Sequence, residues 1–153
     1  MGSAPKCPTL LLVEDSPDDA FLFGRALKKT GLDYSLHHAV NGKEAVQYLE
    51  LALSPHGPDI PDIPDIVFLD LCMPAMNGFE VLKWIKLRDF PRSMRVVVLS
   101  SFANLEDLPR AAESGMTEYI LKPVEVDDLV LLLSGAAMRG MKHEYAPDRK
   151  FSA

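Results

Sequence analysis

Short apolar runs alternate along this chain with longer segments in which apolar residues recur every three or four positions. Runs that are apolar throughout are typical of strands buried on both faces, whereas the longer spacing is typical of amphipathic helices. The predicted strands are Thr9–Val13, Tyr34–Val40, Ile66–Leu69, Arg95–Leu99 and Thr117–Leu121. Since a helical segment follows each strand, the pattern predicts a three-layer, doubly wound α/β fold around five parallel strands.

Capping residues set the expected helix boundaries. Ser16 and Asp19, for example, have the spacing at which a polar side chain caps the first turn of a helix. The predicted helices are Pro17 to about Thr30, Gly42–Leu53, Gly78–Arg88, Asn104–Ser114 and Glu125–Arg139. Pro109 lies inside the fourth of these, and proline is tolerated only in a first turn. That helix is therefore expected to begin late, near Asp107, after an irregular lead-in.

A proline-rich segment, Ser54–Pro64, precedes the third predicted strand. Its prolines exclude a regular helix or strand and predict a stiff, exposed loop, which is either a binding loop or a neutral insertion. The chain of 153 residues, 48% apolar and 25% charged, has the length and composition of one globular domain. We place this domain at residues 9–140, between a flexible segment at 1–8 and a polar tail at 141–153.

Charge and cysteine content restrict the possible functions. The net charge is −6 and the basic residues are scattered, which argues against nucleic-acid binding. The apolar runs are too short to span a bilayer, and the N-terminus lacks the apolar stretch of a secretory signal, so no membrane insertion is expected. The two cysteines, Cys7 and Cys72, are typical of unpaired thiols in a reducing compartment, and we expect a cytoplasmic protein.

Polar residues directly follow four of the predicted strands. Glu14 and Asp15 follow the first strand, Asp70 the third, Ser100 the fourth and Lys122 the fifth. In a doubly wound fold the binding site lies at the carboxyl ends of the strands, so these side chains are expected to meet at one edge of the sheet. The sequence thus predicts a site made of an acid pair, a third acid, a hydroxyl and a lysine.

These residue types suit phosphoryl transfer. Three converging carboxylates repel one another unless a cation joins them, and Mg²⁺ is often held by one or two carboxylates together with a phosphate. A cation there would clamp an incoming phosphoryl group for attack by Asp70, which makes Asp70 the candidate phosphate acceptor. Lys122 and Ser100 can then pair with oxygens of the transferred group.

Each of these residues also has an ordinary structural explanation. A single acid after a strand is more often a helix cap or a solvated loop residue, and Lys122-Pro123 alone only ends a strand. A serine at the position of Ser100 carries almost no information by itself. The joint occurrence of these residue types at the ends of four strands is what favours a phosphorylation site.

Four motifs contain the candidate residues. They are Val13-Glu14-Asp15, Leu69-Asp70-Leu71-Cys72-Met73-Pro74 with Met76-Asn77-Gly78, Val98-Leu99-Ser100-Ser101 and Tyr119-Ile120-Leu121-Lys122-Pro123. In identity and spacing they resemble the motifs of response-regulator receiver domains, and the resemblance covers roughly Thr9 to Arg139. It implies the flavodoxin-like strand order 2-1-3-4-5.

The resemblance also implies roles for individual residues. Asp70 would take a phosphoryl group from a histidine kinase or a phosphotransfer protein. Mg²⁺ would be held by Glu14, Asp15 and Asp70, together with the backbone carbonyl of Cys72. Phosphorylation would act as a switch, in which Ser100 moves toward the phosphoryl group and Tyr119 turns inward behind it.

A narrower resemblance concerns the acidic run Glu14–Asp19 and the proline-rich extension before Asp70. Both are similar to features of single-domain regulators that serve phytochrome-type histidine kinases. Such regulators form homodimers through the face made by the fourth helix, the fifth strand and the fifth helix. The predicted helix Glu125–Arg139 fits an interface, because its apolar residues cover more of its circumference than packing on a sheet requires. The alternative is a helix buried beneath the C-terminal tail.

Three other functions fit parts of the sequence. An aspartate-nucleophile phosphatase resembles this arrangement but carries a second acid, as proton donor, at the position of Cys72. A flavin-binding module is disfavoured because the acidic run Glu14–Asp19 would repel a flavin phosphate. A degenerate receiver that serves only as a binding module is disfavoured by the presence of Asp70 and Lys122. We therefore expect a phosphoacceptor and not an enzyme, capable at most of self-phosphorylation from small donors and of autodephosphorylation.

Overall fold

The computed structural model describes residues 7–55, 57–73, 76–91 and 93–134 of the chain. The predicted tail at 141–153 and most of the predicted flexible segment at 1–8 lie outside these residues. Within the described part of the chain, no helix combines the length and the hydrophobicity needed to cross a membrane.

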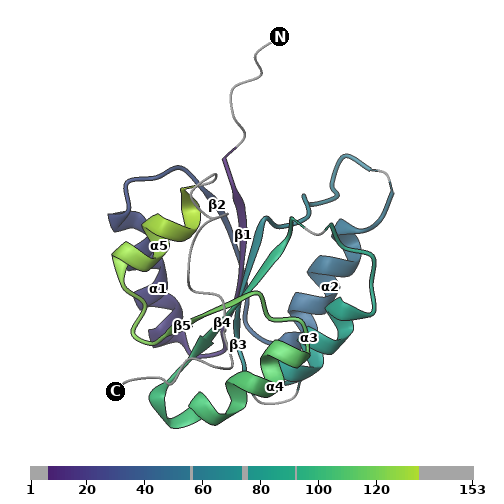
Figure 1. The fold of residues 1–153 in the computed structure, drawn as a ribbon. Coiled ribbons are helices and arrows are strands. Elements are labelled where there is room, and N and C mark those ends of the chain that lie inside the picture. The colour runs from purple at the N-terminus through teal and green to yellow at the C-terminus, as the bar shows by residue number, and fades with distance from the viewer. Residues whose placement is uncertain (1–6, 56, 74–75, 92, 135–153) are drawn as a thin grey trace.

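The strands form one parallel sheet in the order β2-β1-β3-β4-β5 (Figure 1), which confirms the predicted fold. The strands are β1 (Thr9–Val13), β2 (Ser35–Ala39), β3 (Ile66–Asp70), β4 (Arg95–Ser100) and β5 (Glu118–Leu121). The helices are α1 (Pro17–Lys29), α2 (Gly42–Ala52), α3 (Gly78–Lys86), α4 (Leu108–Glu113) and α5 (Val126–Leu133), with a 3₁₀ helix, η1 (Phe102–Asp107), before α4. Each strand begins and ends within about one residue of its predicted bounds.

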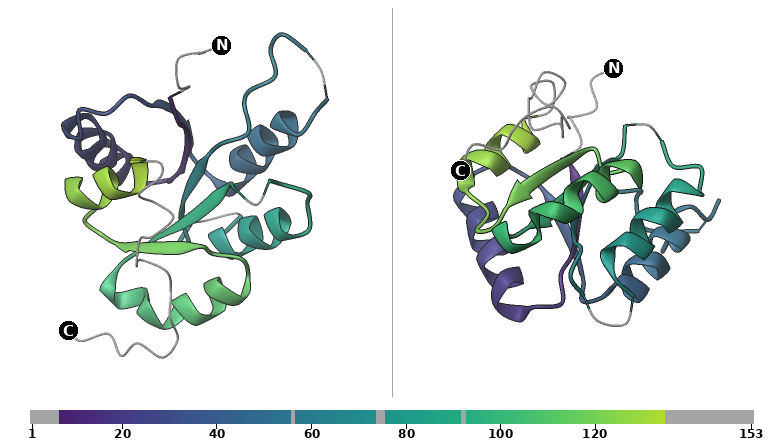
Figure 2. Two further views of the ribbon diagram at one scale, coloured as in Figure 1. Left: turned by 45° about the horizontal axis from the view of Figure 1, so that its top comes forward. Right: turned by 60° about the horizontal axis from the view of Figure 1, so that its bottom comes forward.

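The sheet separates two hydrophobic clusters. Helices α1 and α5 cover one face, and α2, α3 and α4 cover the other, as two further views also show (Figure 2). Side chains alternate along each strand, so Phe68 of β3 packs beneath α1 and α5 whereas Val67 packs on the opposite face. Phe23 of α1 meets Phe68 edge to face, with ring centroids 4.8 Å apart. Burial on both faces explains the apolar runs of β1 and β3, whereas the edge strand β2 is partly exposed and carries His37 and His38.

Capping side chains start α1 and α3, the helices that follow the two strands with acids at their carboxyl ends. The Ser16 hydroxyl accepts a hydrogen bond from the Asp19 N–H at 3.3 Å, and Pro17 occupies the first turn of α1. The Asn77 side chain accepts from the Glu80 N–H at 3.0 Å at the start of α3. These bonds satisfy backbone donors that a helix leaves unpaired, and they fix where α1 and α3 begin relative to β1 and β3.

The late start of α4 is confirmed, and the lead-in before it consists of 3₁₀ turns that are interrupted at Asn104, where the backbone is not helical. Pro109 lies in the first turn of α4, and the six residues before that helix form η1. The 3₁₀ turns satisfy backbone groups through tighter hydrogen bonds than those of an α-helix, on either side of the break at Asn104. The last helix, predicted to reach Arg139, is observed as Val126–Leu133, and residues beyond 134 lie outside the described part of the chain.

The proline-rich segment Ser54–Pro64 contains no helix or strand in its described residues, as predicted. The expectation that it is exposed throughout is wrong. The Tyr48 hydroxyl of α2 donates to the Asp62 carbonyl at 3.3 Å, Ile63 packs against the α2–α3–α4 cluster, and Pro64 is buried. The segment is therefore attached to the core at its C-terminal end, where it leads into β3.

Candidate functional site

Parallel pairing aligns the ends of β1 and β3. The paired residues run up to Val13 and Leu69, so Glu14 and Asp70 are the next residues along the two strands. Both side chains are buried, with exposed fractions of 1% for Glu14 and 7% for Asp70. Buried carboxylates need compensating partners, so this edge of the sheet requires a positive charge or protons.

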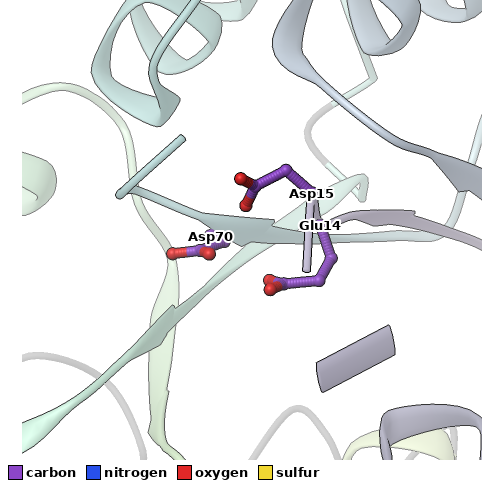
Figure 3. Close-up of side chains that lie close together, drawn as sticks. All are labelled: Glu14, Asp15 and Asp70. Atoms are coloured by element: carbon purple, nitrogen blue, oxygen red, sulfur yellow. The ribbon is translucent and has the colours of Figure 1, made fainter. Parts of the chain in front are cut away.

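The predicted acids come together. Figure 3 shows Glu14 and Asp15 at the end of β1 beside Asp70 at the end of β3. One carboxylate oxygen from each residue lies within 4.8 Å of the other two. A set of three carboxylates fits a small divalent cation such as Mg²⁺, which prefers oxygen ligands.

Lys122 places its ammonium among these acids. Its Nζ lies 2.8 Å from Asp19 Oδ2, 3.3 Å from both carboxylate oxygens of Glu14 and 3.4 Å from Asp70 Oδ2. Burial lowers the pKa of Lys122, but the hydrogen bond to Asp19 and the charges of Asp70 and Glu14 outweigh this effect, so the pKa lies above its ordinary value. The lysine therefore stays charged at every physiological pH.

Glu14 has a perturbed acidity. Burial first, and then the negative charge of Asp70, raise the pKa of Glu14 from 4.5 to about 8, although Lys122 acts in the opposite direction. One lysine thus does not neutralise the cluster. At neutral pH Glu14 holds a proton unless a cation enters.

Backbone contacts hold the two acidic strand ends in place. The Glu14 N–H donates to the Ala39 carbonyl at 3.1 Å, which extends the β1–β2 pairing by one residue. Nε2 of His38 lies 2.8 Å from the Glu14 carbonyl, and since a carbonyl can only accept, Nε2 carries the hydrogen. The Cys72 N–H donates to Asp70 Oδ1 at 3.0 Å. The phosphoacceptor candidate is therefore fixed by its own loop as well as by its strand.

The two predicted switch residues lie on β4 and β5. The Ser100 hydroxyl donates to the Ser101 carbonyl at 3.3 Å, and the Ser100 carbonyl accepts from the Lys122 N–H at 2.7 Å. Tyr119 packs, partly buried, against the cluster beneath α4. Ser100 thus lies at the end of β4, whereas Tyr119 pairs with Val98, two residues before Ser100 in that strand.

Asp19 was not predicted as a site residue. The sequence indicated only its place in the first turn of α1, three residues after Ser16. In the structure its carboxylate is the nearest acidic partner of Lys122. The run after β1 holds two acids, Asp18 and Asp19, beyond the pair assigned to the cation site. A helix start also favours acids, so these residues alone could not indicate a further site residue.

The fold and the site define a class of protein. The family model of the response regulator receiver domain matches residues 10–134. The chain therefore belongs to the response regulator receiver domain family, whose members bind Mg²⁺ at an acidic pocket and interact with histidine kinases. This membership favours the receiver interpretation over the phosphatase and the flavin-binding module.

Individual relatives are also similar to the chain. The probable methanogenesis regulatory protein FilR2 of Methanothrix harundinacea is 36% identical over 120 residues, which cover 78% of this chain and 75% of FilR2. The solved structure of the bacteriophytochrome response regulator AtBRR is 35% identical, with a TM-score of 0.71, and the match covers 93% of this chain and 97% of AtBRR. The phosphorylated cyanobacterial phytochrome response regulator RcpA is 28% identical, with a TM-score of 0.67 and coverage of 86% and 91%.

Proposed function

We propose that this chain is the receiver of a two-component phosphorelay and that Asp70 accepts a phosphoryl group from a histidine kinase. The observation that carries the proposal is the convergence of Asp70 with Glu14, Asp15 and Lys122 at the end of β3. A buried cluster of acids with one lysine lowers the stability of the fold, so stability does not explain why it is there. Its lysine and its cation-binding acids are the groups that stabilise the negative charge of a phosphoryl group.

In the transfer step an Asp70 carboxylate oxygen attacks the phosphorus of a phosphohistidine. A P–O bond forms as the P–N bond breaks, and the imidazole nitrogen keeps the electron pair and takes up a proton from solvent. Lys122 can pair with an oxygen of the transferred group, since it already lies 3.4 Å from Asp70. Ser100 can donate to another oxygen after its hydroxyl turns away from Ser101.

Mg²⁺ is the proposed cofactor. Glu14, Asp15 and Asp70 would hold it, with the Cys72 carbonyl as the further protein ligand. When bound, Mg²⁺ supplies positive charge to the phosphoryl oxygens. Its charge also favours the ionised form of Glu14, which otherwise keeps its proton up to a pH of about 8.

The test is phosphorylation by a small donor. Acetyl phosphate with Mg²⁺ is expected to add one phosphoryl group to the purified protein, which intact-mass spectrometry detects, and chelation of Mg²⁺ is expected to prevent the addition. Asp70→Asn keeps the size of the side chain and removes the nucleophile, so this variant is expected to remain unlabelled. Equal labelling of the variant and the wild type would refute the site assignment, and an unlabelled wild type would favour a degenerate receiver.

A phytochrome-type sensor kinase is the proposed donor. This part of the proposal rests on the similarity to AtBRR and RcpA, which are described as phytochrome response regulators. The chain then acts as a substrate of the kinase and not as an enzyme. We place it in the cytoplasm, where its two unpaired cysteines, Cys7 and Cys72, stay reduced.

Output is proposed to go through a homodimer formed by α4, β5 and α5. Leu131 of α5 exposes 42% of its surface, and Tyr119 and Leu121 of β5 are only partly buried. Phosphorylation would alter this face through Ser100 and Tyr119. Sedimentation at high micromolar concentration is expected to give a dimer, and a monomer in both the phosphorylated and unphosphorylated states would contradict the proposal.

A further inference from the structure

We propose that Asp19 is a positioning residue for Lys122: its carboxylate holds the ammonium toward α1 and competes with the phosphoryl group on Asp70 for that ammonium. The inference rests on the proposed phosphorylation of Asp70 and concerns a residue outside the acidic cation site. It predicts that the Asp19 charge opposes the phosphorylated state.

The Lys122 ammonium lies closer to Asp19 than to Asp70. The distance is 2.8 Å to Asp19 Oδ2 and 3.4 Å to Asp70 Oδ2. A charge-assisted hydrogen bond of 2.8 Å has the optimal length, and one of 3.4 Å is weak. The lysine is therefore bound more closely to the helix that flanks the site than to the residue that receives the phosphoryl group.

The position of Asp19 is fixed by the backbone. Its N–H donates to the Ser16 hydroxyl, which caps α1, so the residue is set in the first turn next to the end of β1. Lys122 is fixed in turn by the bond from its N–H to the Ser100 carbonyl. Both backbones are anchored, so the side chains alone decide how the ammonium is shared among Asp19, Glu14 and Asp70.

The contact between Asp19 and Lys122 can break at low cost. The pair lies at the wall of a cavity of about 640 Å³ between α1 and the segment that follows β5. The Asp19 side chain is 42% exposed and that of Lys122 is 21% exposed. An ion pair that is partly exposed in this way contributes on the order of 1 kcal/mol, so a stronger attraction elsewhere can draw the ammonium away.

Phosphorylation supplies that attraction. The single charge of the Asp70 carboxylate is replaced by a group of about two negative charges. Lys122 moves toward these charges and its bond to Asp19 lengthens, while the Asp19 carboxylate repels the phosphoryl group. Removal of the Asp19 charge is therefore expected to favour the phosphorylated state.

The test uses beryllium fluoride with Mg²⁺, a stable mimic of a phosphoryl group, and measures its binding to the whole chain by tryptophan fluorescence or calorimetry. Asp19→Asn is expected to bind the mimic roughly fivefold more tightly than the wild type, which corresponds to the loss of one partly exposed ion pair. Asp18→Asn is the matched control, because it removes the same charge from the exposed neighbouring residue. It is expected to bind as the wild type does.

Asp19→Glu provides the conservative variant and is expected to retain wild-type affinity, since it keeps the charge. Unchanged or weaker binding by Asp19→Asn would overturn the inference, as would an equal gain in Asp18→Asn or in Asp19→Glu. A residue that only stabilises the fold would give weaker binding, which is the opposite sign. A wild type that neither binds the mimic nor accepts phosphate from acetyl phosphate would contradict the proposed function itself. A wild type that does both, with Asp19→Asn unchanged, would contradict only the role of Asp19.

Discussion

Gly78→Ala is expected to lower the free energy of unfolding by about 3 kcal/mol, because the added methyl group has no space. A Cβ atom at Gly78 would lie 2.6 Å from the Asp70 carbonyl oxygen, 2.6 Å from the Leu71 Cα and 2.9 Å from a Leu71 methyl carbon. Two of these three neighbours are backbone atoms, which cannot move aside as a side chain can. Relief of the clash must displace either the start of α3 or the strand end that carries the phosphoacceptor.

The same substitution is expected to slow labelling by acetyl phosphate by about an order of magnitude, since small displacements of a nucleophile are costly. Urea unfolding at equilibrium and the labelling time course are the two measurements. Gly24→Ala is the matched control, because nothing lies within 4 Å of a Cβ atom at that position in the middle of α1. It is expected to stabilise the protein by about 1 kcal/mol with unchanged labelling. A Gly78→Ala protein as stable as the wild type would contradict the close packing described for this loop.

Metal-free protein is expected to lose about 2 kcal/mol of stability between pH 6 and pH 8. The cause is Glu14, whose pKa is about 8 in the folded chain, whereas the ordinary value of 4.5 applies after unfolding. Between these values the folded state binds more protons than the unfolded state, so the free energy of unfolding falls as the pH rises. Asp19, with a lowered pKa, and Lys122, with a raised one, keep their charges throughout this range and do not contribute to the slope.

Urea unfolding at several pH values in the presence of a chelator measures this slope. Glu14→Gln is expected to flatten the curve, and Glu50→Gln, on the exposed side of α2, is the control that should retain the wild-type slope. Saturating Mg²⁺ is expected to stabilise the wild type more at pH 8 than at pH 6, because binding releases the Glu14 proton. A wild-type curve that stays flat from pH 6 to pH 8 would show that burial does not hold the proton on Glu14.

The sequence was sufficient to predict the strands of the sheet, because the apolar runs that indicate buried strands are local features. A strand covered on both faces reads as a nearly continuous apolar run, and β1 and β3 do so at every residue except Thr9 and Asp70. Parallel pairing then requires the strand ends to meet, so Glu14, Asp70 and Lys122 could be assigned to one edge before any coordinates were known.

Contacts between elements were not predictable in the same way. The bond between Asp19 and Lys122 depends on how α1 lies against the segment after β5, and the two residues are far apart in the sequence. The attachment of the proline-rich segment through Ile63 and Pro64 depends on the packing of α2 and α3. The 3₁₀ turns in the lead-in to α4 were not predicted, because proline excludes an α-helix but permits 3₁₀ turns in the residues before it.

Because the sheet divides the core into two clusters, substitutions on one face can accumulate without disturbing the packing of the other. Among the residues that the structure describes, the cluster beneath α1 and α5 shares no side chain with the cluster beneath α2, α3 and α4. Destabilising effects of core substitutions on opposite faces should therefore be additive, for example those at Phe23 and at Leu108. Evolution can then remodel the helices of one face, and with them one set of partners, while the packing of the other face stays as it was.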